Sequence, residues 1–188
     1  AVLFYVRFFS IPWLDGEGNN FYTGELLWPN FQASWPLLTT PDGKNLQAMQ
    51  ALGLPLINTV ILVISSVTLH IAHSALKSNQ RKKLISFLAI TIALALIFLF
   101  LQIIEYRHAY QELNLKLDSG IYGNTFFLLT GFHGIHVFLG MTILIVMLFR
   151  IIKRHFSKDN HFAFLAASWY WHFVDIVWIN LYLFVYIL

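Results

Sequence analysis

Four long apolar runs constrain this chain more than any other feature of its sequence. A helix needs about 20 mostly apolar residues to cross a bilayer, and each of the four runs reaches that length. With 58% hydrophobic and 11% charged residues, the composition also lies far from that of a soluble domain. The sequence therefore predicts an all-α fold, a polytopic transmembrane helical bundle, with spans at about 54–76, 84–106, 123–152 and 164–188.

The N-terminal part of the chain does not fit this pattern. Residues 1–12 are apolar but too few to cross a membrane, and they are preceded by neither a methionine nor the charged region of a signal peptide. We interpret the chain as a fragment that begins inside a helix. A partial helix at 1–12, an irregular outer loop at 13–53 and the four spans would form a single membrane domain over 1–188, with about five helices.

Basic residues predict how the chain crosses the membrane, because lysine and arginine accumulate in cytoplasmic loops. The connections after the first and third full spans are basic, whereas the segment at 13–53 is mainly acidic. We expect the basic connections inside and the C-terminus outside. Topology is the favoured explanation of the basic clusters, and attraction of anionic lipid headgroups is the alternative. The basic residues are Lys77, Arg81, Lys82 and Lys83 in one connection, and Arg150, Lys153, Arg154 and Lys158 in the other.

Polar side chains occur in pairs within the spans. An ionisable group inside a membrane faces protein or water and usually has a partner. Residues three apart share one helix face, so each pair lies on a single face of its helix. The pairs are His70 with His73, Gln102 with Glu105, His133 with His136, and His172 with Asp175.

The same spacing suits metal ligands, and Glu105 with His108 reproduces the Glu-x-x-His pattern of di-iron bundles. Such a site needs two of these motifs and two further glutamates, whereas this chain has one motif. At about 1.5 Å of rise per residue, the histidines of the last two spans share one depth while His73 lies near the inner surface. The chain has no cysteine, so thiolate ligands are excluded. We expect no cofactor or metal in this chain and interpret the histidines as links between helices.

Asp175 lies near the middle of the last span, where an unpaired charge is unfavourable. We expect Asp175 or His172 to bond to a polar group on another helix, with His133 or His136 as the preferred partner. Glu105 joins these four residues in the expected intramembrane polar network.

Glycines at 123, 131, 134 and 140 fall within the third full span. Small residues let helix backbones approach closely in lipid. We expect this helix to pack tightly against its neighbours.

Five motifs, taken in order, carry a resemblance to a known family. They cover nearly everything from residue 55 onward, and TGFHGIHV and WYWHFVD are the most specific parts. The motifs are PLINT at 55–59, AHSAL at 72–76, QIIEY at 102–106, SGIYGNTFFLLTGFHGIHV at 119–137 and HFAFLAASWYWHFVDIVW at 161–178. Together they resemble cytochrome c oxidase subunit III, and the earlier segments FYVRFFSIPWLDGEG and LLWPNFQASWP resemble its bacterial members.

The resemblance implies a non-redox, integral-membrane subunit of an aa3-type oxidase. Haem and copper would belong to partner subunits, chiefly subunit I, in a complex that reduces oxygen with electrons from cytochrome c and pumps protons. Family members usually have seven helices, so this chain would begin within the third. The implied location is a bacterial inner membrane, with a periplasmic C-terminus and no nucleic-acid partner.

A bound phospholipid is also implied. Arg150, Lys153 and His155 follow an apolar span at the inner surface, where basic residues attract anionic headgroups. One departure from the family is Leu165, which stands where members commonly have a glutamate. That replacement removes an acidic group near the inner surface.

Two other functions stay open. A quinol oxidase subunit III shares the motifs, and its electron donor docks elsewhere. A stand-alone membrane di-iron enzyme is the more distant alternative. The residues of this chain do not identify the electron donor.

Overall fold

The structure is a computed structural model that describes residues 52–113, 121–156 and 161–187. Within these ranges, four helices are long and apolar enough to cross a membrane. They are α4 (Leu54–Lys77), α5 (Arg81–Gln111), α6 (Ile121–Ile152) and α7 (Phe162–Leu181), and α7 continues as a π-helix, η1 (Tyr182–Ile187). The all-α transmembrane fold is thus confirmed. The expected partial helix at 1–12, and the outer loop up to residue 51, lie outside the described residues.

The chain divides into two compact units. One comprises Ala1–Met49 and His108–Leu128, and the other comprises Gln50–Arg107 and Leu129–Leu188. The second unit, called here the helical unit, contains α4, α7 and most of α5 and α6. Every contact between helices described below lies within the helical unit.

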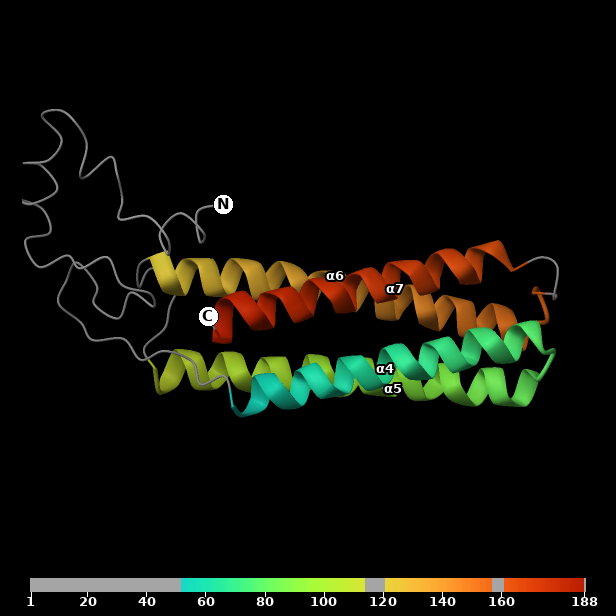
Figure 1. Cartoon of the computed structure of the whole chain (residues 1–188), viewed down its shortest axis with the longest axis horizontal. Coiled ribbons are helices and arrows are strands. Elements are labelled where there is room, and N and C mark those ends of the chain that lie inside the picture. The colour runs from blue at the N-terminus through green and yellow to red at the C-terminus, as the bar shows by residue number, and fades with distance from the viewer. Residues whose placement is uncertain (1–51, 114–120, 157–160, 188) are drawn as a thin grey trace, which may run out of the picture. The chain divides into compact units, whose positions relative to one another are not determined.

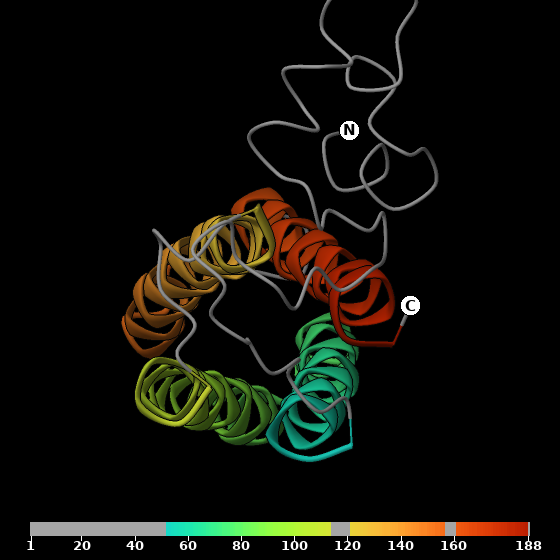
Figure 2. The same ribbon diagram turned by 90° about the vertical axis from the view of Figure 1, so that its left-hand side faces the viewer.

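Neighbouring helices of the helical unit run antiparallel and side by side (Figure 1). Viewed from one end, α4 is next to α5 and α7. Helix α6 is next to the same two helices and lies opposite α4 (Figure 2). Hydrogen bonds join Thr68 of α4 to Thr91 of α5, Trp171 of α7 to Ser65 of α4, and Tyr106 of α5 to Thr130 of α6.

The helices are longer than their apolar parts. The span expected at 84–106 lies within α5, whose hydrogen bonding continues from Arg81 to Gln111. Long basic side chains keep their charges in water while their stems cover apolar surface, so a helix can extend past the hydrocarbon. The π-helical end of the last span was not predicted, because hydrophobic periodicity carries no sign of a change from i+4 to i+5 hydrogen bonds.

Two helices end in the same way at the end of the unit that carries the α4–α5 and α6–α7 connections. Asn79, with φ of 56°, follows α4, and Arg154, with φ of 60°, follows α6. The next residue in each case donates its N–H to a carbonyl five residues back: Gln80 to Ala75 at 2.9 Å and His155 to Arg150 at 3.0 Å. These are Schellman motifs, in which the left-handed position usually holds glycine.

Large aromatic side chains of α7 fill the core of the helical unit. Trp171 and Trp178 are fully buried, and Phe98 of α5 meets the Trp178 ring edge-on at 4.9 Å between centroids. Such edge-to-face contacts add to the stabilisation from burial alone.

The glycines of α6 differ in their surroundings. A Cβ built on Gly140 would lie 3.0 Å from the Trp171 ring and 3.2 Å from Tyr170, whereas one on Gly134 would meet nothing within 4 Å. At Gly131 the nearest atom is the Tyr106 hydroxyl, at an ordinary 3.5 Å. The expected tight packing therefore holds at Gly140, where α6 meets α7, and not at Gly134.

We predict opposite effects for the same substitution at these two glycines. Alanine in place of glycine stabilises a helix interior by about 1 kcal/mol, and Gly134→Ala should retain that gain. Gly140→Ala should lower the thermal midpoint, because overpacking typically destabilises by about 1–3 kcal/mol. Thermal unfolding of the detergent-solubilised protein, followed by circular dichroism, measures both. Equal shifts for the two variants would contradict the close α6–α7 contact.

Candidate functional site

Polar side chains join α4 to α7 along what we call the α4–α7 seam. Trp178 Nε1 donates to Thr59 Oγ1 at 3.1 Å, and one level further along, Trp171 Nε1 donates to Ser65 Oγ at 3.0 Å. Beside the second bond, Ser66 Oγ lies 2.6 Å from His172 Nδ1. Indole N–H groups usually find an acceptor when buried, and here the hydroxyls of α4 provide one for each. The seam consists of Thr59, Ser65, Ser66, Trp171, His172 and Trp178.

The three hydroxyl residues of the seam were not among the predicted site residues. A signal for them is nevertheless present, since Thr59 and Ser66 are seven residues apart and lie on one face of an apolar helix. Ser65 follows Thr59 by six positions, and Trp178 follows Trp171 by seven. The two tryptophan bonds are therefore spaced almost equally along α4 and along α7, which run antiparallel, and they fix the register of the two helices.

The expected partner of His172 was wrong. His172 does bond to another helix, but its partner is Ser66 and neither His133 nor His136. His136 Nδ1 instead lies 3.0 Å from the Tyr170 hydroxyl. The physical reason is that α6 packs against the side of α7 that carries Tyr170, whereas His172 points to α4.

His133 is buried among aromatic rings of the helical unit. Its ring centroid lies 4.9 Å from that of Trp178 and 6.0 Å from that of Phe98, which it meets edge-on. A buried histidine packed in this way fills space between α5, α6 and α7.

Glu105 is completely buried, and its Oε1 accepts a hydrogen bond from the Tyr186 hydroxyl at 2.6 Å. Tyr186 lies on η1, so the π-helix holds the end of the chain's last span against α5. His108, the other half of the Glu-x-x-His pattern, pairs with Glu112 at 3.0 Å. Among the described residues, no three His, Cys, Asp or Glu side chains lie together as metal ligands would.

Asp175 is 5% exposed and faces the α4–α7 seam. Neither carboxyl oxygen makes a hydrogen bond of good geometry within the described ranges, although the Ser66 hydroxyl lies close enough to interact with it. The amides of Asn58 and Gln102 are likewise buried without hydrogen bonds in the part of the chain that the structure describes. Glu105, His133 and His136 of the expected polar network thus lie in separate contacts, whereas His172 and Asp175 both lie beside Ser66.

A basic cluster occupies the end of the helical unit where α4 and α6 finish. Arg81 Nη2 donates to the carbonyl oxygens of Ile151 at 2.7 Å and Ile152 at 2.6 Å. Since the last carbonyls of a helix have no partner within it, Arg81 caps α6 from a different helix. Arg150 lies nearby with its guanidinium 4.7 Å above the Phe156 ring. Lys153 and His155, the other two residues expected to bind lipid, are exposed.

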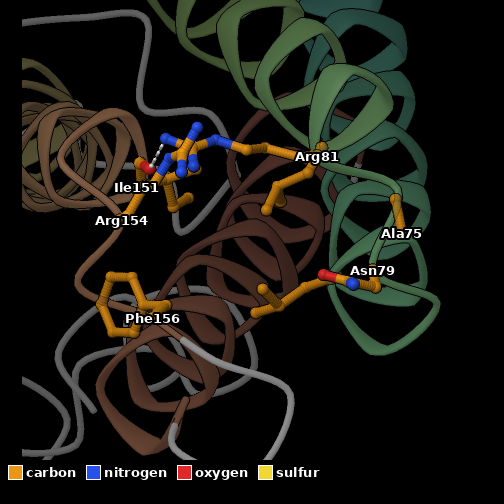
Figure 3. Close-up of a pocket in the computed structure, with 8 residues that line it drawn as sticks. Ala75, Asn79, Arg81, Ile151, Arg154 and Phe156 are labelled. Carbon is orange, nitrogen blue, oxygen red and sulfur yellow. Dashed lines mark hydrogen bonds between the residues drawn. The ribbon is translucent and has the colours of Figure 1, made fainter.

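Beside this cap is a small pocket, drawn in Figure 3, with a volume of about 80 Å³. The sequence assigned Arg81 and Arg154 chiefly to membrane topology, with attraction of anionic lipid headgroups as the alternative, and it did not single out Asn79. Their convergence depends on how the ends of α4 and α6 fold, which no local motif reports. The pocket is lined by Ala75, Leu76, Asn79, Arg81, Leu84, Ile151, Arg154 and Phe156.

Known proteins resemble this chain over most of its length. Cytochrome c oxidase subunit 3 of Hippopotamus amphibius is 45% identical over 158 residues, which are 84% of this chain and 57% of that protein. The subunit 3 proteins of Struthio camelus and Danio rerio are 44% and 45% identical over the same lengths. The chain therefore spans little more than half the length of these relatives.

The family model described as cytochrome c oxidase subunit III matches residues 21–188. That range includes the whole helical unit from α4 to η1, and with it the seam, the Gly140 contact and the basic cluster. On this match, and on the identity with the relatives above, the chain belongs to the cytochrome c oxidase subunit III family.

Proposed function

We propose that this chain serves as subunit III of an aa3-type cytochrome c oxidase, an integral-membrane subunit without redox chemistry of its own. The observation that carries the proposal is the family match across residues 21–188. The uses of its polar side chains support the same role, because Ser65, Ser66 and Thr59 bond to α7 and Glu105 bonds to η1. Side chains committed to helix–helix bonds act as structural links.

The proposed partner is oxidase subunit I, which would hold haem and copper and reduce oxygen to water while protons are pumped. The helical unit has apolar outward faces suited to such a partner and to lipid. On α4 and α7, for example, Val67, Phe173 and Ile176 are each more than half exposed. The proposed location is a bacterial inner membrane, crossed several times, with the basic connections inside and the C-terminus outside.

A quinol oxidase subunit III remains the nearest alternative, because the two kinds of subunit share motifs and differ in the donor used by the complex. The ligands of a copper centre in the accompanying subunit II would favour cytochrome c as the donor, and their absence would favour quinol. A stand-alone di-iron enzyme would instead hold about two irons in the isolated chain. Elemental analysis distinguishes that alternative.

Phospholipid is the proposed ligand of Arg150, Lys153 and His155. The three residues lie at the basic end of α6, and each basic residue near an anionic membrane surface contributes about 1 kcal/mol to binding. Arg150 is held above Phe156, which limits where its charge can lie.

The first prediction from this role concerns the cofactors. If the subunit is removed from the purified complex by detergent, the haem absorbance of the remaining complex should stay, because haem and copper belong to other subunits. Absorption spectra and metal analysis before and after removal provide the measurement. Loss of the haem signal while subunit I remains folded would contradict the proposal.

The second prediction concerns lipid. A map of the protein in native lipid should show at least one lipid phosphate next to Arg150 or Lys153. The proposed lipid site would be wrong if a well-resolved map showed only protein or bulk water beside both side chains.

The third prediction concerns the α4–α7 seam. Ser66→Ala removes the partner of His172, and hydrogen bonds between membrane helices contribute about 0.6–1.7 kcal/mol, so the thermal midpoint should fall. Thr142→Ala is the matched control, since the exposed Thr142 hydroxyl bonds only to Phe138 O of its own helix. Thermal unfolding in detergent compares the two variants. An unchanged midpoint for Ser66→Ala would show that this bond of the seam does not stabilise the protein.

A further inference from the structure

The pocket of Figure 3 is formed by segments distant in sequence. Asn79 follows α4, Arg81 begins α5 and Arg154 follows α6, so three helix ends meet around it. In this view Arg81 reaches across from α5 to Ile151 at the end of α6, where Arg154 also lies. The pocket is thus lined by two guanidinium side chains and one amide side chain, above apolar walls that include Leu84 and Phe156.

The backbone at Arg154 is the first reason to look for a ligand. A left-handed conformation is easily adopted by glycine and tolerated by asparagine, but it is unfavourable for a long side chain such as arginine. Asn79 therefore sits comfortably at its helix end, whereas Arg154 with φ of 60° does not. Strained non-glycine residues cluster at functional sites, and here the strained residue lines the pocket.

The charge balance is the second reason. The lining contains two arginines and no acidic residue. The negative ends of the helix dipoles of α4 and α6 favour a positive charge nearby. Arg81 supplies that charge and bonds to Ile151 O and Ile152 O. Arg154 has no ion pair within the described residues. Within the described residues, one guanidinium is therefore left without a counter-charge beside a pocket that already holds another.

We propose that this pocket binds a phosphate-type oxyanion through Arg154 and the free N–H groups of Arg81, with Asn79 as a further donor. Guanidinium groups match the oxygen geometry of phosphate in a bidentate way. A volume of about 80 Å³ suits one such group and is too small for a whole nucleotide or lipid. The anion is either the phosphodiester of a lipid headgroup, whose tails remain outside, or free phosphate. The site is separate from Arg150 and Lys153 and goes beyond the proposed oxidase role.

The test uses the purified full-length protein in detergent, together with any subunits that accompany it. Dioctanoyl phosphatidylglycerol and inorganic phosphate are titrated separately, and native mass spectrometry counts the bound molecules. Arg154→Gln should weaken binding at this site by about tenfold or more, as expected for loss of a charge-assisted hydrogen bond. The matched control is Lys83→Gln, which removes an exposed positive charge from α5 outside the pocket and should leave binding unchanged.

Arg154→Gly separates the side chain from the backbone. It should weaken binding as strongly as Arg154→Gln but raise the thermal midpoint, because glycine relieves the left-handed conformation. Loss of binding in a protein made more stable cannot be attributed to misfolding. If only the lipid responds to these variants, the anion is a headgroup phosphate; if inorganic phosphate responds as well, the site also takes the free ion.

Three results would overturn the proposal. The first is that neither probe binds, and the second is that Lys83→Gln weakens binding as much as Arg154→Gln, which would indicate general surface charge. The third is that Arg150→Gln abolishes lipid binding while both Arg154 variants leave it intact. That last result would retain the lipid site proposed at Arg150 and reject this one. The haem spectrum of the complex is independent of all three, so the oxidase role is tested separately.

Discussion

The pairing of α4 hydroxyls with α7 ring nitrogens is the interaction on which the rest of the helical unit depends. In lipid, apolar side chains gain little by leaving the solvent, so helix association relies on packing and on hydrogen bonds between helices. The two tryptophans could not be buried without acceptors for their N–H groups, and Ser65 and Thr59 are those acceptors. Once both indoles are fixed, their rings form the surface against which Phe98, His133 and Gly140 pack.

The ends of the helices obey a different constraint, because water and headgroups replace hydrocarbon there. The last carbonyls of α6 are satisfied by a Schellman motif and by Arg81 from α5. This arrangement ties the start of one helix to the end of another through hydrogen bonds. It also places a positive charge at the negative end of the helix dipole, which is favourable. The interior and the ends of the unit are thus held by chemically different bonds.

The sequence predicts the fold class and the approximate spans well, because long apolar runs in a membrane have few alternatives to the helix. It predicts poorly which polar groups meet. His172 was correctly expected to bond across helices, but the choice of partner depended on the rotation of α6 about its axis, which periodicity does not fix. The seam hydroxyls were missed because serine and threonine are common in apolar helices. The meeting of Asn79 with Arg154 depends on two separate helix ends and has no local signature.

Asp175 shows how the two kinds of constraint combine. Its neighbours Trp171 and Trp178 donate their N–H groups to α4, and the Ser66 hydroxyl, which also bonds to His172, lies close enough to interact with the carboxyl group. An ionised carboxylate in such surroundings would be strongly unfavourable unless paired. The polar pair at the centre of the last span thus meets α4 at one residue: His172 hydrogen-bonds to Ser66, and Asp175 lies close enough to the same hydroxyl to interact with it.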